Sequence, residues 1–194
     1  MTKIVGLTGG IGSGKTTIAK HIKSLGIPVY IADDEAKKML LLPESLNSLK
    51  LVFGNAIFDD EILNKDKLST IVFNNPEMLE KLNQIIHPAV KNDFDNWLKV
   101  NKNSPLVVKE AAILFESGSY KDCDAIITIV APLNSRINRV IKRDNTNYEA
   151  VLSRINNQWT DEMRITKSDY VIENEDVNVS CAQTENILKT LSNQ

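Results

Sequence analysis

The stretch Gly9-Gly-Ile-Gly-Ser-Gly-Lys-Thr16 decides how this chain is interpreted. It has the spacing G-x-x-x-x-G-K-[ST], and it falls between the apolar run Lys3–Thr8 and a helical pattern that ends near Leu25. Glycines let the backbone curl until successive N–H groups face one anion, and the start of a helix adds partial positive charge. The stretch therefore predicts a phosphate-binding loop, with a glycine-rich turn as the alternative.

The loop predicts a nucleoside triphosphate and a metal ion as its ligands. Lys15 is expected to reach the β- and γ-phosphates, and the Thr16 hydroxyl is expected to coordinate Mg²⁺. The residues expected to contact the nucleotide here are Gly10, Ile11, Gly12, Ser13, Gly14, Lys15, Thr16 and Thr17. The motif indicates the ligand but not the reaction.

The remaining strand-like runs are short, apolar and rich in β-branched residues, and long helical patterns separate most of them. Such alternation predicts an α/β protein with a parallel sheet covered on both faces. The five expected strands are Lys3–Thr8, Pro28–Ile31, Leu106–Lys109, Ala125–Val130 and Tyr170–Glu173.

The second and third of these strands are about 75 residues apart, far more than one crossover helix requires. Within this gap, Glu77–Val100 shows a helical apolar pattern that Pro88 is expected to kink or interrupt. We therefore expect a single domain with a core at 1–34, 105–140 and 166–194, a helical substrate-binding insertion at 35–104 and a lid at 141–165.

Composition excludes several classes of protein. The 194 residues are 42% hydrophobic and 25% charged, which is typical of a globular chain. The net charge of −2 disfavours a nucleic-acid partner, and no apolar run is long enough to span a membrane. The N-terminus reaches its glycines too early for a signal peptide. Cys123 and Cys181 form no metal or disulfide pattern, so we expect a cytoplasmic protein. Both cysteines are expected to be buried.

A small-molecule kinase fits this chain better than a GTPase or a motor. No glycine has an aspartate three residues before it, so the D-x-x-G of GTPases is absent. Thr166-Lys-Ser-Asp169 resembles a guanine-reading motif, but it precedes a strand rather than following one. A large mechanical ATPase would need a longer chain. A nucleotide-binding regulatory module with little turnover stays open as an alternative.

The arginines favour an enzyme. All five lie between Arg136 and Arg164, and arginine is suited to forked phosphate contacts. Arg136, Arg139 and Arg143 share one helical face. The alternative is a solvated face with ordinary ion pairs, such as one between Arg143 and Asp144.

Three further positions carry candidate chemistry. Asp33 and Asp34 follow the second strand, and there a carboxylate can accept the proton of an attacking hydroxyl or cap a helix. Glu110 closes the third strand, where it can hold Mg²⁺ through water or be an exposed strand end. His87 lies on the polar side of its helix, and either a ligand contact or a surface position fits it.

Segments along nearly the whole chain resemble the dephospho-CoA kinase family. That family phosphorylates the ribose 3′-hydroxyl of dephospho-CoA in the last step of coenzyme A synthesis. The resemblance implies a fold like that of nucleoside monophosphate kinases, with strand order 2-3-1-4-5. Matching segments are Ile4–Thr17, Val29–Ala36, Leu82–Pro88, Ala111–Glu116, Arg143–Asp144, Arg154–Gln158 and Asp169–Asn174.

The resemblance implies roles for individual residues. Asp33 matches the proposed base of the family, and His87 matches a histidine near the CoA side. Glu110 falls where the family commonly has an aspartate, Arg143 matches a lid arginine near the phosphates, and Asn174 matches a residue on the adenine side. We also assign Arg139 to the nucleotide. The expected catalytic residues are thus Asp33, Lys15 and Arg143. Thr16 and Glu110 are expected to serve the metal, and Asp33, His87 and Glu110 are expected to contact the substrate.

Three departures from the family pattern affect this interpretation. Ile31 replaces the first aspartate of D-A-D, Ala112 replaces the proline of P-L-L, and Asp176 stands at a usual glycine. None removes a part that phosphoryl transfer requires. We expect ATP and Mg²⁺ as cofactors and dephospho-CoA as substrate, with no nucleic acid or membrane partner and a monomer favoured. Another small P-loop nucleoside or nucleotide kinase is the alternative enzyme.

Overall fold

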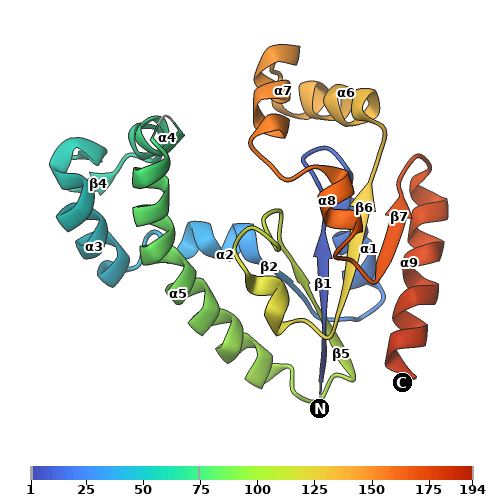
Figure 1. Cartoon of the computed structure of the whole chain (residues 1–194). Coiled ribbons are helices and arrows are strands. Elements are labelled where there is room, and N and C mark those ends of the chain that lie inside the picture. Colours follow the sequence, from blue (N-terminus) through green and yellow to red (C-terminus); the bar gives the residue numbers. More distant parts are fainter. Residues whose placement is uncertain (1, 74, 194) are drawn as a thin grey trace. The chain divides into compact units, whose positions relative to one another are not determined.

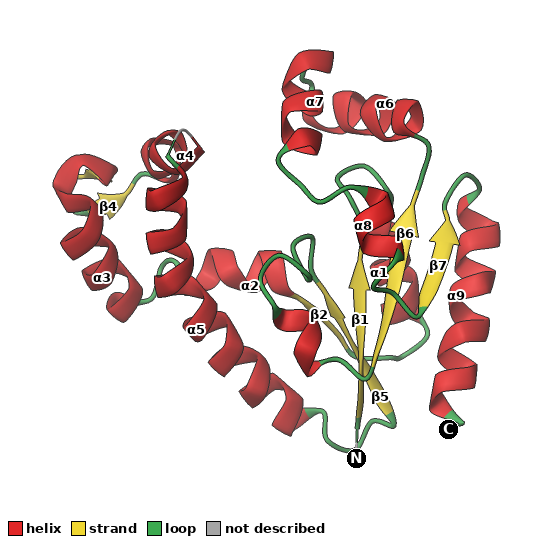
Figure 2. Cartoon of the chain, viewed as in Figure 1, coloured by secondary structure: helices red, strands yellow, loops and turns green. Residues whose placement is uncertain are grey.

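A computed structural model describes residues 2–73 and 75–193 (Figures 1 and 2). The chain forms two compact units. The first consists of Met1–Ile31 and Val100–Gln194, and the second consists of Ala32–Lys99.

The first unit is built on a five-stranded parallel sheet. Its spatial order is β2-β5-β1-β6-β7, which is 2-3-1-4-5 when these five strands are counted along the chain. The fold class and the strand order are confirmed. The strands are β1 (Lys3–Thr8), β2 (Val29–Ile31), β5 (Leu106–Glu110), β6 (Ala125–Val130) and β7 (Tyr170–Glu173).

Two helices supply the main core of this unit. Ile18 and Ile22 of α1 (Lys15–Ser24) and Leu188 of α9 (Val177–Ser192) pack against sheet residues such as Leu7 and Ile127. All five side chains are at most 2% exposed. Because Ile18 and Ile22 are four residues apart, they lie on one face of α1, and their burial fixes the direction in which the helix leaves the phosphate loop.

Three helices follow β6. Figure 1 shows α6 (Leu133–Asp144) and α7 (Tyr148–Asn156) beyond the carboxyl ends of the strands, before α8 (Asp161–Ile165) returns to the sheet. The Asn147 side chain caps α7 and the Thr160 side chain caps α8. Ile137 and Val140 of α6 form a small separate core with Val151 of α7. The short 3₁₀ helix η2 (Ser119–Asp122) lies between β5 and β6.

The second unit has its own apolar core, formed by Leu49, Ile57, Leu63, Leu68 and Val72. Its helices are α2 (Ala32–Met39), α3 (Pro43–Phe53), the 3₁₀ helix η1 (Gly54–Ile57), α4 (Lys65–Phe73) and α5 (Pro76–Val100), and its strands are β3 (Phe58–Asp59) and β4 (Ile62–Leu63).

The structure of this region differs from the prediction in two places. The region predicted as helical contains an antiparallel hairpin of β3 and β4, whose turn residues Asp60 and Glu61 have φ of 46° and 69°. Two positive φ angles are typical of a tight hairpin turn, but this turn lacks the glycine that signals one in a sequence. Pro88 lies inside α5 without ending it. The carbonyl that loses its helical partner belongs to Gln84, which is exposed and can be hydrated.

The cysteines also differ from the expectation. Cys123 and Cys181 are free thiols of intermediate exposure rather than fully buried residues. Burial is still sufficient to raise the pKa of the Cys123 thiol to about 11, so this thiol stays protonated at neutral pH.

Within the described residues, the helices are all too short or too polar to cross a membrane.

Candidate active site

The phosphate loop connects β1 to α1 and is shaped by its glycines. Gly12 and Gly14 have φ of 80° and 97°, values that side-chain-bearing residues rarely adopt. Gly14 caps α1, and its carbonyl accepts hydrogen bonds from the N–H groups of Thr17 and Ile18 at 2.9 and 3.2 Å. The first turn of α1 carries no acidic residue. The positive end of this helix is therefore suited to an anion.

Lys15 and Glu110 form an ion pair beside the loop, with Nζ 3.2 Å from Oε1. The parallel register places Glu110 opposite Leu7, at the end of β5. Because its side chain is only 2% exposed, the alternative of an exposed strand end is wrong. A buried carboxylate stabilises the charge of Lys15 and holds its ammonium at the loop.

Arg139 and Asn174 support the loop through its carbonyl groups. Nδ2 of Asn174 donates to the carbonyl of Ser13 at 2.7 Å. Nη2 of Arg139 donates to the carbonyl of Asn174 at 2.8 Å, and its Nη1 lies 3.4 Å from the carbonyls of Gly12 and Ser13. A Cβ atom on Gly14 would collide with the Asn174 amide. These two predicted nucleotide residues thus lie against the loop backbone in this structure.

A buried network of charges lies next to this support. Arg136 donates from Nε to the carbonyl of Ile11 at 2.9 Å and pairs with Asp161 at 2.8 Å. Arg164 is fully buried and pairs with Asp161 at 3.5 Å and with Glu116 at 3.2 Å. Burial lowers the pKa of Arg164, and the two carboxylates oppose that change. For Arg136 and Arg164, the solvated-face alternative is wrong.

The remaining two arginines are arranged differently. Arg143 and Arg154 are 60% and 45% exposed, and both pair with Asp144 at 2.7 and 2.9 Å. The Arg143 guanidinium holds the pKa of Asp144 below its usual range. The ion pair between Arg143 and Asp144 that the sequence suggested as an alternative is present. An exposed guanidinium exchanges such a partner for a phosphate at little cost.

Asp33 and His87 belong to the second unit. Asp33 lies in the first turn of α2, two residues after the end of β2. Because α2 begins at Ala32, neither Asp33 nor Asp34 is the residue that precedes the helix as a cap. His87 is half-buried on α5, and burial lowers the pKa of its imidazole.

The described contacts thus assemble part of the predicted site. They bring Lys15 to Glu110, and Arg139 and Asn174 to the loop. Thr16 and Thr17 lie exposed on the first turn of α1. Sequence reasoning left Arg136 and Gln158 out of the site, although both bind the loop backbone. For Arg136, the available signal was its place in the arginine cluster. For Gln158, it was the Arg154–Gln158 segment.

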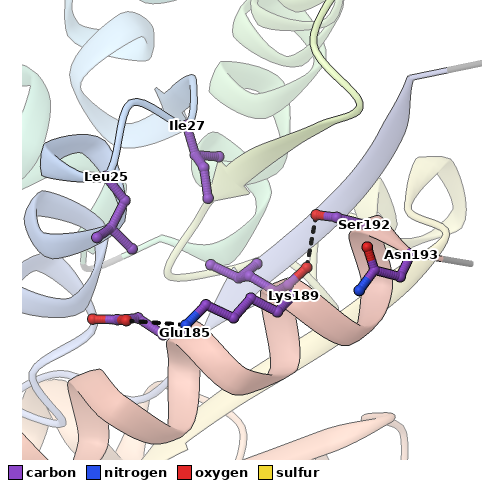
Figure 3. Close-up of a pocket in the computed structure, with 7 residues that line it drawn as sticks. Leu25, Ile27, Glu185, Lys189, Ser192 and Asn193 are labelled. Atoms are coloured by element: carbon purple, nitrogen blue, oxygen red, sulfur yellow. Dashed lines mark hydrogen bonds and ion pairs between the residues drawn. The ribbon is translucent and has the colours of Figure 1, made fainter.

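A cavity of about 340 Å³ lies elsewhere in the first unit (Figure 3). It is lined by Leu25 and Ile27 after α1 and by residues of α9, with Glu185 and Lys189 3.7 Å apart. Because α1 begins at the phosphate loop and ends before Leu25, the cavity lies at the opposite end of a helix that is about 15 Å long. It is not part of the candidate site.

The sheet order, the loop after β1 and the lysine on the following helix place the chain among the P-loop kinases. The dephospho-CoA kinase family model matches residues 3–179. The chain therefore belongs to the dephospho-CoA kinase family.

Individual relatives agree with this assignment. A dephospho-CoA kinase of Fusobacterium nucleatum is 42% identical over 172 residues, which cover 88% of this chain and 89% of the relative. A dephospho-CoA kinase of Bacteroides fragilis is 37% identical over 172 residues, covering 88% and 84%.

Solved structures share the fold. The Thermus thermophilus protein TT1252 has a TM-score of 0.90 at 30% identity, with 97% of each chain covered. A dephospho-CoA kinase from Campylobacter jejuni has a TM-score of 0.70 at 25% identity, covering 100% of this chain and 98% of that one. Shikimate kinase from Acinetobacter baumannii, at 17% identity and a TM-score of 0.57, shares the fold alone, with 100% and 96% covered.

Proposed function

We propose that this protein transfers the γ-phosphoryl group of ATP to the ribose 3′-hydroxyl of dephospho-CoA, which gives coenzyme A and ADP. The bond between the 3′-oxygen and phosphorus forms while the bond from phosphorus to the β,γ-bridging oxygen breaks, and ADP leaves. The ion pair between Lys15 and Glu110 at the phosphate loop is the observation that carries the proposal. It supports triphosphate binding, because it holds the Lys15 ammonium at the loop, and membership of the dephospho-CoA kinase family supports the reaction.

The loop residues suit the phosphates of ATP. Positive φ at Gly12 and Gly14 curls the backbone, and Lys15 supplies a charge beside the start of α1. Thr16 and Glu110 offer hydroxyl and carboxylate oxygens, the donor types that Mg²⁺ prefers together with substrate phosphates. We assign both residues to Mg²⁺, which when bound would neutralise charge that develops on the transferred group.

We propose that Arg143 also neutralises the charge that develops on the transferred phosphoryl group. It lies at the end of α6 in segment 141–165, for which we propose a lid function. Its exposed guanidinium can leave Asp144 for a phosphate, and planar bidentate contacts favour that exchange. Arg139 and Asn174 act on the nucleotide by holding the loop in shape.

The acceptor side of the proposal consists of the insertion 35–104 and of Asp33, two residues before it. Asp33 accepts the proton of the 3′-hydroxyl or orients that hydroxyl toward the γ-phosphate. His87 is assigned to dephospho-CoA, and burial lowers the pKa of its imidazole, which favours the neutral form. A neutral imidazole offers one donor and one acceptor to a polar ligand.

An ATP-consumption assay against a panel of acceptors tests the proposal. The panel contains dephospho-CoA, adenosine, AMP and pantetheine compounds. We expect turnover with dephospho-CoA to exceed turnover with each other acceptor. Preference for adenosine or AMP would assign the protein to another nucleoside or nucleotide kinase. Turnover with none of the acceptors, combined with tight ATP binding, would indicate a regulatory module.

A further inference from the structure

Ile11 lies in the middle of the phosphate loop, and both of its backbone polar groups bind side chains from later in the chain. Its carbonyl accepts from Nε of Arg136 on α6 at 2.9 Å. Its N–H donates to Oε1 of Gln158, in the connection between α7 and α8, at 2.9 Å. The loop is thus attached from both sides to the segment 133–165.

The side chain of Ile11 adds an apolar attachment. It packs against the small core formed by Ile137, Val140 and Val151, which joins α6 to α7. On this side the loop lies so close to Arg136 that a Cβ atom on Gly12 would collide with the Arg136 backbone. The loop and the α6–α7 pair therefore form one packed body in which a shift of either displaces the other.

We propose that Gln158 is a positioning residue for phosphoryl transfer, because its side-chain carbonyl fixes the Ile11 amide and so couples the phosphate loop to the arginine-bearing segment 133–165. The proposal rests on the proposed function of the same loop. Near the start of α6, Arg136 and the apolar contact of the Ile11 side chain hold this helix to the loop. Gln158 is the point at which the far end of the segment, after α7, is held to the same residue.

The chemistry of the side chain fits this role. The Ile11 N–H donates to a neutral amide, which accepts the bond without adding negative charge beside bound phosphates. A carboxylate would accept the same bond and repel the nucleotide. Losing the acceptor frees the connection that returns the chain from α7 to α8, and small displacements of catalytic groups are costly in phosphoryl transfer.

The test compares Gln158→Met, which has a similar length but lacks a good acceptor, with Asn157→Ala as the matched control. Asn157 is the exposed neighbour in the same connection. Three quantities are measured on the full chain: hydrogen exchange of the Ile11 amide in ¹⁵N-labelled protein, the ATP dissociation constant, and kcat with dephospho-CoA. Thermal unfolding confirms that each variant is folded.

We expect Gln158→Met to speed exchange at Ile11 at least tenfold and to lower kcat about tenfold, with ATP affinity changed less than threefold. Asn157→Ala is expected to change none of these more than twofold. Unchanged exchange at Ile11, or faster exchange with kcat within twofold of wild type, would overturn the coupling. If the wild type does not phosphorylate dephospho-CoA, the proposed function fails, and the exchange measurement still decides whether Gln158 holds the loop.

Discussion

The two compact units differ in how firmly contacts within each unit hold the residues of the predicted site. In the first unit, the phosphate loop is held by Arg136, Arg139, Asn174 and Gln158, and Lys15 lies on a buried acid. In the second unit, Asp33 lies in the first turn of α2. Its neighbours pair locally, Asp34 with Lys37 at 2.8 Å and Glu35 with Lys38 at 2.7 Å, across exposed or half-exposed side chains.

This difference suggests a division of labour. The nucleotide side is built by contacts within one unit, so its geometry exists before a ligand binds, and preorganised charge is effective in catalysis. The acceptor side depends on groups that belong to another unit with a separate core. Removing a direct phosphate contact in the first unit, such as that of Lys15, is therefore expected to weaken ATP binding, whereas substitution of Asp33 in the second unit is expected to lower turnover with ATP binding nearly unchanged.

The largest effect is expected for Asp33→Asn. Asparagine keeps the size of the side chain but cannot accept a proton, and the loss of a general base typically lowers turnover about 10²–10⁴-fold. Ile31 offers no second carboxylate to replace it. Steady-state kinetics with dephospho-CoA measure the change, with Asp34→Asn as the matched control. A drop of less than about threefold for Asp33→Asn would move the base elsewhere: to Asp34 if its variant loses activity, and otherwise Glu110 is next to test.

Lys15→Ala is expected to lower kcat about 10²–10³-fold, because it removes a charge that stabilises the transferring phosphoryl group. It also removes the ion pair with the buried Glu110, which is expected to lower stability. The double variant Lys15→Ala/Glu110→Gln removes the buried charge. It is expected to recover stability in thermal unfolding without recovering activity. Near-normal turnover in a folded Lys15→Ala protein would contradict the phosphate-loop assignment.

Arg143→Ala is expected to lower turnover at least about tenfold, since phosphoryl-transfer arginines act mainly in the transition state. Stability is expected to change by less than about 1 kcal/mol, because the ion pair of Arg143 is exposed. Arg143→Lys keeps the charge but loses the planar fork, so it should not restore full activity. Arg154 pairs with the same carboxylate, so Arg154→Ala serves as the matched control. Unchanged kinetic constants for Arg143→Ala would make Arg143 an ordinary surface ion-pair former.

The sequence predicted much of the first unit because its signals are local. Five apolar strands and a motif between a strand and a helix define the sheet and the loop, and the predicted boundaries of three strands, 3–8, 125–130 and 170–173, are confirmed. The β3–β4 hairpin was missed because Asp60 and Glu61 adopt positive φ without a glycine. The helix at 77–100 was predicted correctly, but Pro88 does not interrupt it, since the carbonyl that loses its partner belongs to the exposed residue Gln84 and can be hydrated.

The site was harder to predict because side-chain partners are not local. Arg136 and Gln158 bind Ile11 across 125 and 147 positions of sequence. Clustering of arginine in the sequence could not separate Arg136 and Arg164, which are buried among carboxylates, from Arg143 and Arg154, which are exposed. Which arginine holds the fold and which one is accessible to a phosphate depends on packing that no spacing rule encodes.

The smallest effect is expected for the contribution of His87 to the pH dependence of stability. Burial lowers the pKa of His87 below that of an unfolded histidine, so the unfolded chain takes up this proton first as the pH falls. The stability difference between wild type and His87→Gln is therefore constant above pH ~7, and wild type loses stability relative to the variant below about pH 6.5. Chemical unfolding between about pH 5 and 8 measures the free energy of unfolding of both proteins. Parallel pH curves would contradict a buried neutral imidazole.

The most direct test of the division of labour is the ATP dissociation constant of Asp33→Asn beside that of Lys15→Ala/Glu110→Gln, measured by calorimetry in the presence of Mg²⁺. The account predicts that Asp33→Asn binds ATP within about threefold of wild type, whereas the variant that lacks Lys15 and the proposed metal residue Glu110 binds at least about tenfold more weakly. Equal losses of affinity in both variants would contradict it, because Asp33 would then belong to the nucleotide site.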